Sequence, residues 1–429
     1  MSLEVVILAA GFGTRMRSEK AKVLHKISGK EMIYHIIKES KKLTDNITVI
    51  LGYQNQEVKA VIDSYFEGIK TVIQDIDNYP GTGGAILGVE FSANRVLVLN
   101  GDMPLVCKEE LEGFLAYKAE VVASVIELDN PSGYGRAILE SGKLKKIVEQ
   151  KDADKDELNV KTVNAGVYLF TKSFLEEFLP KLDNDNKQKE YYITDLIEFA
   201  NAKRIAVDAI VVDEKSFKGV NSKLDLSEAE EILNEKIISS WAKKGVKFTL
   251  PKTTLVEEGV VFEGECEVEP NCVLKAPLTI KNSTIKSGSV VEQSIIEDSI
   301  IGPLAHIRPN SVIKSSHIGN FTEVKKSTLK GVKANHLSYI GDAEIDEGTN
   351  IGAGTITCNY DGKSKYKTKI GKNVFIGSDT QLVAPISLED DVIIGAGSTI
   401  TKDVKKGELA LSRTQQKNIA NFFYRFFGK

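Results

Sequence analysis

The sequence predicts two domains of different classes: a doubly wound α/β domain at residues 1–221 and a parallel β-helix at 246–429, joined by a helix at 222–245. The first half alternates short apolar runs with amphipathic stretches, which is typical of strands and helices in a mostly parallel sheet. The second half repeats an aliphatic residue every six positions, which is typical of a parallel β-helix. At 429 residues, the chain is also long for a single core.

The elements of the first half follow one another along the chain. The predicted strands are Val5–Leu8, Ile47–Leu51, Thr71–Gln74, Val96–Asn100 and Val121–Ile126, and the predicted helices are Met32–Lys42 and Gln56–Phe66. Ligands of such sheets bind at the carboxyl ends of the strands. We therefore expect a binding site at the loops that follow Leu8, Ile73 and Leu99.

A helix is predicted between the two halves, because apolar residues recur at helical spacing from Leu224 to Trp241. The sequence Lys243-Lys244-Gly245 would end this helix well, with cations in the last turn and a glycine after it.

From about residue 250, aliphatic residues recur every six positions. The predicted inward-facing residues are Val256, Phe262, Val268, Leu274 and Ile280, then Ile295, Ile301, Ile307 and Ile313, then Ile370, Ile376, Leu382, Leu388, Ile394 and Ile400. Each should stack on the aliphatic residue one coil below, in turns of about 18 residues. Ordinary alternating strands do not hold such a phase. The repeat breaks at Thr357–Thr368, which we interpret as a loop outside the coil, where solenoids often place function.

Composition excludes several classes of partner. The net charge of −4 gives no basic field to recruit nucleic acid. No apolar run approaches the roughly 20 residues of a membrane helix, and Met1–Leu8 has neither a basic region nor a cleavage site of a signal peptide. The four cysteines form no CxxC pair, which favours reduced thiols. We therefore expect a cytoplasmic protein with no nucleic-acid or membrane partner.

A glycine-rich run, Leu8-Ala9-Ala10-Gly11-Phe12-Gly13-Thr14-Arg15-Met16, follows the first predicted strand. Glycines allow a close approach of the backbone, and successive amides can cradle phosphates. The run lacks the third glycine of the usual dinucleotide fingerprint. Arg15 and Lys22 strengthen a phosphate interpretation, since both offer cations to a triphosphate.

The run Leu8–Met16, with Lys22-Val23-Leu24 after it, resembles the signature of sugar nucleotidyltransferases. Further motifs follow in the family order: Gln74, Gly81-Thr82-Gly83, Asn100-Gly101-Asp102, Gly133-Tyr134-Gly135-Arg136, Ile147-Val148-Glu149, Asn164-Ala165-Gly166, Glu190–Asp195 and Gly219-Val220-Asn221. With the hexapeptide half, nearly the whole chain resembles the bacterial bifunctional N-acetylglucosamine-1-phosphate uridylyltransferase / glucosamine-1-phosphate N-acetyltransferase family. The resemblance implies a Rossmann-like nucleotidyltransferase domain followed by a left-handed parallel β-helix.

The resemblance also implies two reactions. The C-terminal domain would acetylate glucosamine 1-phosphate with acetyl-CoA. The N-terminal domain would then transfer UMP from UTP to N-acetylglucosamine 1-phosphate, giving UDP-N-acetylglucosamine and pyrophosphate. This product would serve peptidoglycan and lipopolysaccharide synthesis, and the enzyme would be a homotrimer with acetyl sites between subunits.

For the first domain, the resemblance implies catalytic cations at Arg15 and Lys22 and Mg²⁺ ligands at Asp102 and Asn221. Magnesium prefers a few hard oxygen ligands, so one carboxylate and one amide suffice when phosphates supply the rest. The implied nucleotide contacts are Leu8, Ala9, Ala10, Gly11, Lys22, Gln74, Gly81 and Thr82; the sugar contacts are Gly135, Glu149 and Asn164; and Asn100, Gly101 and Asn221 complete the substrate site. Two residues depart from the family pattern: Asn100 replaces a tyrosine and Ala21 replaces a proline.

For the second domain, acyl transfer to an amine needs a base, and histidine titrates in the right range. Of five histidines, His336 matches the family position of the base, and Glu323 would orient its ring. The implied sugar-phosphate contacts are Arg308, Lys325 and Lys365 on the phosphate, with Tyr339, Asn350, Asn359 and Tyr360 around the sugar. The implied acetyl-CoA contacts are Ala353, Ser378, Ala396 and Arg413, the last because guanidinium pairs bidentately with phosphate.

Two alternatives stay open at this point. The first is a monofunctional sugar-1-phosphate nucleotidyltransferase whose β-helix is only structural; His336, Lys325 and the segment 350–360 argue against it. The second is a non-catalytic scaffold that senses nucleotide sugars, which the presence of Asp102 and Lys22 disfavours.

Overall fold

The computed structural model describes residues 2–140 and 142–428, and the chain forms two compact units, Met1–Leu233 and Asn234–Lys429. The division falls within α8 (Lys223–Lys243), which occupies the predicted linker. The first part of α8 contributes Ala229 to a small core of the first unit, and the second part contributes Ile238 to the core of the second. Among the described residues, no helix is long and apolar enough to cross a membrane.

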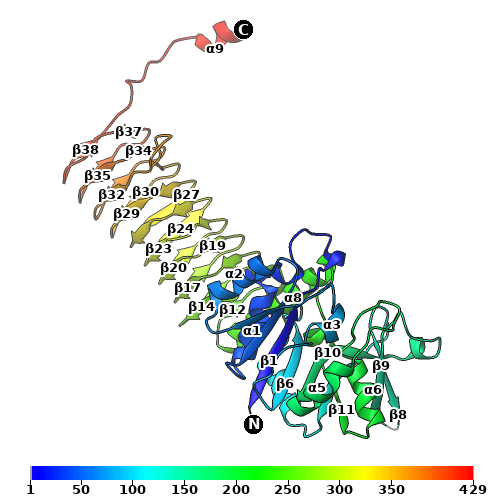
Figure 1. The fold of residues 1–429 in the computed structure, drawn as a ribbon. Coiled ribbons are helices and arrows are strands. Elements are labelled where there is room, and N and C mark those ends of the chain that lie inside the picture. Colours follow the sequence, from blue (N-terminus) through cyan, green and yellow to red (C-terminus); the bar gives the residue numbers. More distant parts are fainter. Residues whose placement is uncertain (1, 141, 429) are drawn as a thin grey trace. The chain divides into compact units, whose positions relative to one another are not determined.

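One mixed sheet forms the first unit, with the strand order β11-β7-β10-β6-β1-β4-β5 (Figure 1). Its strands are β1 (Leu3–Ala9), β4 (Ile47–Leu51), β5 (Lys70–Ile73), β6 (Arg95–Asn100), β7 (Val121–Glu127), β10 (Thr162–Thr171) and β11 (Val207–Val211), with β8 (Arg136–Glu140) and β9 (Lys143–Val148) as a hairpin beside β10. β4 and β6 run parallel to β1, whereas β10 runs antiparallel between β6 and β7. The predicted α/β class is confirmed, and the antiparallel β10 and the hairpin are additions that strand–helix alternation does not predict.

Helices cover both faces of this sheet. They are α1 (Met32–Lys41), α2 (Asn55–Tyr65), α3 (Gly81–Gly84), α4 (Lys108–Leu115), α5 (Lys172–Phe178), α6 (Asp195–Ala202) and α7 (Glu214–Phe217), with the short 3-10 turns η1 (Thr14–Met16), η2 (Lys22–Leu24), η3 (Glu157–Asn159) and η4 (Leu179–Lys181) and a small hairpin of β2 (Lys26–Ile27) and β3 (Lys30–Glu31). Alternate side chains of a strand point to opposite faces, so Ile7 packs with Ile36 of α1 whereas Val6 packs in the cluster of Phe174 from α5. A sheet buried on both faces explains the continuous apolar runs of β1 and β6.

The second unit is a β-helix of three parallel sheets, consistent with the predicted left-handed hexapeptide solenoid. One sheet holds β12 (Lys247–Phe248), β15 (Glu267–Val268), β18 (Thr284–Ile285), β21 (Ile300–Ile301), β24 (His317–Asn320), β27 (Lys333–His336), β30 (Asn350–Ile351), β33 (Phe375–Ile376), β36 (Ile393–Ile394) and β38 (Leu409–Ala410). The next holds β13 (Leu255–Val256), β16 (Val273–Lys275), β19 (Val290–Glu292), β22 (His306–Ile307), β25 (Glu323–Lys325), β28 (Tyr339–Gly341), β31 (Ile356–Cys358), β34 (Gln381–Val383) and β37 (Thr399–Ile400). The third holds β14 (Val260–Glu263), β17 (Leu278–Lys281), β20 (Ile295–Glu297), β23 (Val312–Lys314), β26 (Thr328–Lys330), β29 (Ala343–Ile345), β32 (Thr368–Ile370) and β35 (Ile386–Leu388). Outside the sheets lie η5 (Pro251–Thr253) and α9 (Phe422–Phe427).

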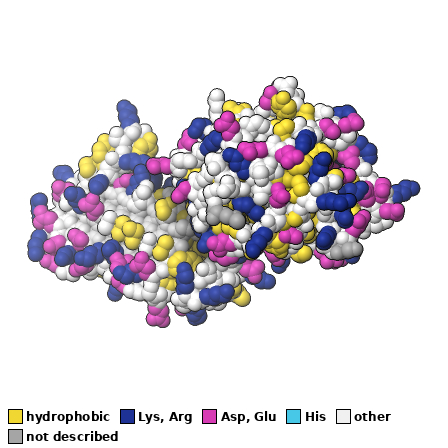
Figure 2. Space-filling model, turned by 60° about the horizontal axis from the view of Figure 1, so that its bottom comes forward, with side chains coloured by type: hydrophobic (Ala, Val, Ile, Leu, Met, Phe, Trp, Pro, Cys, Tyr) yellow, Lys and Arg dark blue, Asp and Glu magenta, His cyan; other side chains and the backbone are white. Residues whose placement is uncertain are grey.

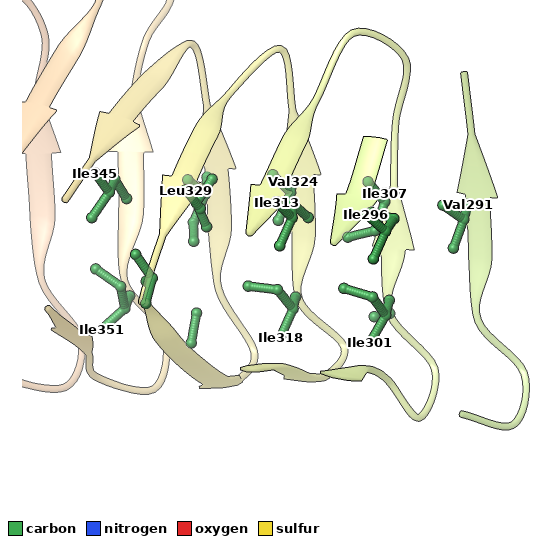
Figure 3. Packing of buried hydrophobic residues seen from close by; sticks show 14 of the residues in the cluster. Val291, Ile296, Ile301, Ile307, Ile313, Ile318, Val324, Leu329, Ile345 and Ile351 are labelled. Atoms are coloured by element: carbon green, nitrogen blue, oxygen red, sulfur yellow. The ribbon is translucent and has the colours of Figure 1, made fainter. Parts of the chain in front are cut away.

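The core of the β-helix consists of aliphatic side chains that stack from one coil to the next (Figure 3). In one sheet, Ile301 pairs in register with Ile318, and Ile318 pairs with Ala334. All three side chains are fully buried. The six-residue pattern therefore marks the inward positions, as predicted.

The prediction that Ile295 faces inward is wrong by one position. Its side chain is 45% exposed, whereas Ile296 is fully buried in the stack. The register pairs Ile296 with Ile280, so this coil is shorter than 18 residues and the phase slips. The shortening removes residues from turns, which do not contribute to the core.

Buried serines line one corner of the coils. The Ser299 hydroxyl donates to the carbonyl of Glu297 at 2.6 Å and accepts from the amide of Ser316, one coil further, at 3.0 Å. The amide of Ser299 in turn donates to the hydroxyl of Ser283 at 3.0 Å. This column satisfies backbone groups that the turns would otherwise leave buried and unpaired.

The predicted loop at Thr357–Thr368 lies where one coil is longer than the others. Ile345 of β29 pairs with Ile370 of β32, and residues 359–367 between β31 and β32 are the insertion. A bridge between Tyr360 and Lys365 closes it into a small hairpin. On the face drawn in Figure 2, Lys and Arg side chains are interspersed with Asp and Glu, so that face carries mixed charge.

We expect Ile301→Ala to lower the free energy of unfolding of the second unit by about 2–5 kcal/mol, because it leaves a cavity in a closely packed stack. The neighbouring Ile300 on the same strand is 38% exposed, so Ile300→Ala should cost about 1 kcal/mol or less. The single tryptophan, Trp241, packs on Phe262 of this unit with ring centroids 5.4 Å apart. Its fluorescence in a urea titration measures both variants, and equal losses would contradict the assigned phase.

Candidate functional site

A pocket of about 830 Å³ lies in the first unit at the carboxyl ends of the parallel strands. The loops after β1, β5 and β6 line it, together with α3, so the three predicted loops meet there. The predicted residues that line the pocket are Leu8, Ala9, Ala10, Gly11, Lys22, Gln74, Gly81, Thr82, Asn100 and Asp102. The structure thus gathers the predicted nucleotide contacts around one cavity.

Gln74 organises one wall of this pocket. Its backbone amide donates to the carbonyl of Leu51 at 2.8 Å, which places the residue directly after β5. Its side-chain amide donates to the carbonyls of Tyr79 at 2.8 Å and Gly81 at 3.0 Å. The turn before α3 is therefore fixed to the end of the sheet. Gly81 has φ near +92°, and a Cβ there would lie 2.6 Å from the carbonyl of Tyr191, so a glycine is required.

Lys22, Asp102 and Asn221 meet beside the pocket although they are far apart in the chain. The Lys22 ammonium forms an ion pair with the Asp102 carboxylate and donates to the Asn221 side-chain oxygen at 3.0 Å. Arg15 donates to the same oxygen at 2.9 Å. The amide of Val220 donates to the Asp102 carbonyl at 2.9 Å, which holds the two oxygen-bearing residues together. Two oxygens of the kind that Mg²⁺ prefers thus converge on one cation.

The predicted sugar contacts also lie together: Gly135 directly before β8, Glu149 directly after β9 and Asn164 on β10. The amide of Asn164 donates to the Gly135 carbonyl at 2.9 Å, and a Cβ at Gly135 would lie 3.2 Å from the Glu149 carboxylate. Burial raises the pKa of Glu149, and Asp152 and Glu190 raise it further. A half-buried carboxyl of this kind favours ligands that offer hydroxyl donors.

Hydrogen bonds hold three further predicted residues, Asn100, Gly101 and Thr82, to neighbouring segments of the first unit. Asn100 donates from its side chain to the Gly166 carbonyl at 3.3 Å, and the amide of Gly101 donates to Leu8 at 2.9 Å. The Thr82 hydroxyl accepts from the amide of Ile193 at 3.3 Å. Ala21, the other departure from the family pattern, is buried, and its amide donates to the Gln54 side chain at 2.7 Å.

Sequence reasoning missed several residues of the pocket wall. Phe12 and Tyr53 both line it, with ring centroids 4.0 Å apart, and Glu190 lies in the wall as well. Tyr53 could have been found, because it follows the predicted strand Ile47–Leu51 and the strand-end rule applies there as well. Glu190 begins the motif Glu190–Asp195 of the family resemblance, which pointed to this segment without giving the residue a contact.

In the second unit, the three predicted phosphate contacts form a cluster of cations. The adjacent Lys365 ammonium lowers the pKa of Lys325, and burial and Arg308 lower it further. Arg308 donates to Glu323 at 2.8 Å. Like charges held together are unfavourable by themselves, so the cluster is suited to an anion with several oxygens.

Three of the four predicted sugar contacts lie beside this cluster, and the fourth, Asn350, lies on a strand of another sheet. Asn359 is buried and its side-chain amide donates to the Asp342 carboxylate at 2.5 Å. A Cβ at Gly341 would lie 2.5 Å from the Tyr339 hydroxyl and 2.8 Å from the Asn359 amide, so these two side chains share one small space. Tyr360 is exposed and faces Lys365 across the inserted hairpin. Asn350 is half-buried and pairs in register with Lys333.

His336 is exposed at the end of β27, in register with Asn320. The Gly354 amide donates to the His336 carbonyl at 3.4 Å. Glu323, predicted to orient the ring, instead accepts from Arg308 in this structure. The roles of His336 and Glu323 stay predictions.

The four predicted acetyl-CoA contacts lie on successive coils. The Ala353 carbonyl accepts from Asp379, next to Ser378, at 2.8 Å, and the Ser378 carbonyl accepts from Gly397, next to Ala396, at 2.8 Å. Arg413 donates to the Ala396 carbonyl at 3.1 Å. Ser378, Ala396 and Arg413 are exposed, and Ala353 is half-buried. The result is an accessible edge of small residues that ends at a guanidinium.

Comparison with known proteins covers both units. A model of the MobA-like NTP transferase domain matches residues 5–160, and a model of bacterial transferase hexapeptide repeats matches 367–402. The bifunctional protein GlmU of Nitratiruptor sp. is 58% identical over 429 residues, 100% of each chain. That of Wolinella succinogenes is 56% identical over 428 residues, 100% of this chain and 99% of its own. Among solved structures, a UDP-glucose pyrophosphorylase complexed with UDP-glucose covers 55% of this chain and 100% of its own at 21% identity, with a TM-score of 0.44.

We expect Lys325→Gln to weaken binding of a sugar 1-phosphate about 10- to 100-fold, the usual effect of losing one hydrogen bond to a charged group. Lys326→Gln is the matched control, since Lys326 is adjacent and exposed and is outside the cation cluster. Isothermal titration with glucosamine 1-phosphate measures both. Equal losses in the two variants would mean that the sugar phosphate does not bind at the cation cluster.

Proposed function

The chain belongs to the GlmU family of bifunctional transferases, and from this premise we propose which of its residues serve each of two consecutive reactions. The second unit acetylates glucosamine 1-phosphate with acetyl-CoA. The first unit transfers UMP from UTP to the N-acetylglucosamine 1-phosphate so formed, which releases pyrophosphate and yields UDP-N-acetylglucosamine. The observation that carries the proposal is the convergence of Lys22, Asp102 and Asn221 beside the pocket.

Mg²⁺ fits the first site because two oxygens already point at one cation. The Asp102 carboxylate and the Asn221 side-chain oxygen, which both contact the Lys22 ammonium, would hold the metal. Bound there, it would neutralise charge on the triphosphate oxygens. Lys22 and Arg15 would then be available to pair with phosphate oxygens. The half-buried Glu149 and the neighbouring Asn164 would fix the sugar through its hydroxyl groups.

The second site is suited to a phosphate, an amine and a thioester. Arg308, Lys325 and Lys365 would bind the sugar 1-phosphate. The edge from Ala353 to Ala396 has little side-chain bulk, so an extended acyl donor can lie along it, and Arg413 would pair with a phosphate of CoA.

Acetyl transfer forms a bond between the amine nitrogen and the acetyl carbon and breaks the bond between that carbon and sulfur. The amine is an ammonium in water, and its nitrogen must lose one proton to expose the lone pair that attacks; we assign His336 as the base that takes this proton. The nitrogen loses a second proton as the amide forms, and this proton goes to the sulfur, so that CoA leaves as the thiol. Glu323 could orient the His336 ring only after its ion pair with Arg308 breaks. A bound phosphate would attract Arg308 and so favour that break.

We also propose a homotrimer in the cytoplasm. The flat faces of a three-sided coil suit closed threefold packing, in which a neighbour could complete the exposed acetyl edge. The four cysteines are free thiols in the described chain, which suits a reducing compartment. The cation cluster and His336 disfavour a β-helix that is only structural.

Asp102→Ala should lower uridylyl transfer by about two to three orders of magnitude, as expected when a group that stabilises transition-state charge is lost. Acetyl transfer should persist, because its proposed residues lie in the other unit. Asp129→Ala, at a fully exposed aspartate that pairs with Lys161, is the control. Separate steady-state assays of the two half-reactions decide the matter, and loss of both activities in a folded Asp102→Ala protein would contradict two independent sites.

His336→Ala should lower acetyl-transfer turnover by about two orders of magnitude or more, the usual contribution of a general base. Uridylyl transfer on N-acetylglucosamine 1-phosphate should not change. The histidine controls are His306, which pairs with Glu292 at 2.9 Å, and His317, which lies near enough to His336 that the two charges interact. If His317→Ala lowers acetyl-transfer turnover strongly and His336→Ala leaves it unchanged, the base is His317 and not His336.

A further inference from the structure

The loop of residues 11–20 carries Arg15 and leads towards Lys22, yet it has few buried contacts of its own. Within this fully described segment, Met16 is the only buried residue. The stem of Lys22 packs against the loop backbone, since a Cβ at Gly13 would lie 2.7 Å from the Lys22 Cβ. A loop with so little burial depends on individual hydrogen bonds for its conformation.

The turn after β4, residues 52–54, lies against both ends of this loop. The Tyr53 amide donates to the carbonyl of Ala10 at 3.3 Å, and the Tyr53 hydroxyl donates to the carbonyl of Glu19 at 3.0 Å. A Cβ at Gly52 would lie 2.5 Å from the same Ala10 carbonyl, so the two backbones approach each other closely. The turn can therefore determine the conformation of the loop.

Gln54 makes the contact of this turn that lies nearest to Lys22 in the chain. It is the N-cap of α2 and has a left-handed backbone (φ 51°, ψ 43°), and its side chain does not cap this fully described helix. Its side-chain oxygen instead accepts from the amide of Ala21, directly before Lys22, at 2.7 Å. Asn or Gly would suit a left-handed N-cap better than Gln does. The choice of Gln thus serves the contact with Ala21 and not the helix.

We propose that Gln54 is a positioning residue for uridylyl transfer, because its bond to the Ala21 amide fixes the backbone that leads into Lys22. The inference rests on the proposed function, in which the Lys22 ammonium pairs with phosphate oxygens. That ammonium contacts the Asp102 carboxylate and donates to the Asn221 oxygen at 3.0 Å. A lysine side chain is a point charge on a flexible stem, so a fixed backbone limits the positions that the ammonium can reach. Gln54 acts only through Ala21 and need not touch a substrate.

The first test is Gln54→Asn, which keeps the amide group and suits the left-handed N-cap, but has a side chain one methylene too short for the bond to Ala21. We expect kcat/KM for UTP in uridylyl transfer to fall about three- to tenfold, the usual effect of losing one hydrogen bond. The thermal unfolding midpoint, followed by circular dichroism, should not fall. The matched control is Gln293→Asn, at a left-handed glutamine of the second unit (φ 42°), and it should leave uridylyl transfer unchanged.

A double-mutant cycle with Lys22→Met tests whether Gln54 acts through Lys22. Lys22→Met alone should lower uridylyl transfer by about two to three orders of magnitude, and adding Gln54→Asn should cause no further loss. A parent rate in Gln54→Asn, or an equal further loss in the Lys22→Met background, would overturn the inference. A parent rate in Lys22→Met would overturn the proposed role of Lys22 and the inference with it, and this outcome is recognisable without any change at Gln54.

A substitution at Ala21 tests the backbone restraint directly. The φ of Ala21 is −52°, which lies in the range of proline. In the parent chain, the ring of Ala21→Pro would replace the hydrogen that Gln54 accepts and press on its oxygen, so uridylyl transfer should fall. In the Gln54→Asn chain there is room for the ring, which holds φ by itself, so the same substitution should recover most of the lost rate. Losses of similar size in both chains would overturn the inference.

Discussion

The stacking of one buried aliphatic side chain on the next determines where most of the residues proposed to act in the β-helix lie. Because Val324 stacks on Ile307 and Ile340 stacks on Val324, the outward residues beside them also come into line. Arg308 and Lys325 thereby approach each other from successive coils, and the inserted hairpin adds Lys365. The cations repel one another, and the apolar stack beneath them, the Arg308–Glu323 pair and the nearby Asp342 offset that repulsion.

In the first unit, the ends of the strands place the residues of the site. The parallel strands β1, β4, β5 and β6 end at one edge, where side chains no longer have to pack between helices and can face a ligand. The backbone approaches its neighbours closely at Gly81 and Gly101, and the Gln74 side chain holds the loop between β5 and α3 in shape. Asp102 and Asn221, although 119 positions apart, are joined by a backbone hydrogen bond through Val220.

The fold class and the three loops that form the pocket could be predicted from the sequence, because they follow from periodicity and from the strand-end rule. The individual residues of the pocket wall came from the family resemblance. Ile295 shows the limit: a coil can lose a turn residue without altering its core, so the period alone cannot locate the slip to Ile296. The pairing of Glu323 with Arg308 depends on coil register, which no local pattern encodes. The antiparallel β10 was missed for a similar reason, since strand direction is decided by tertiary packing and not by the alternation of residues.

The solenoid is stacked in one dimension, and its last coil is only half covered. Leu409 of β38 is 59% exposed, with no further coil on it in the described chain. In such an array each layer is stabilised only by its neighbours, so fraying begins at the outermost layer. Ala396 and Arg413 lie at that end. A bound acyl donor or an adjoining subunit that covers these two residues would stabilise the terminal coils. The protection of the terminal coils from hydrogen exchange would then report how much of the acyl-donor site or subunit interface is occupied.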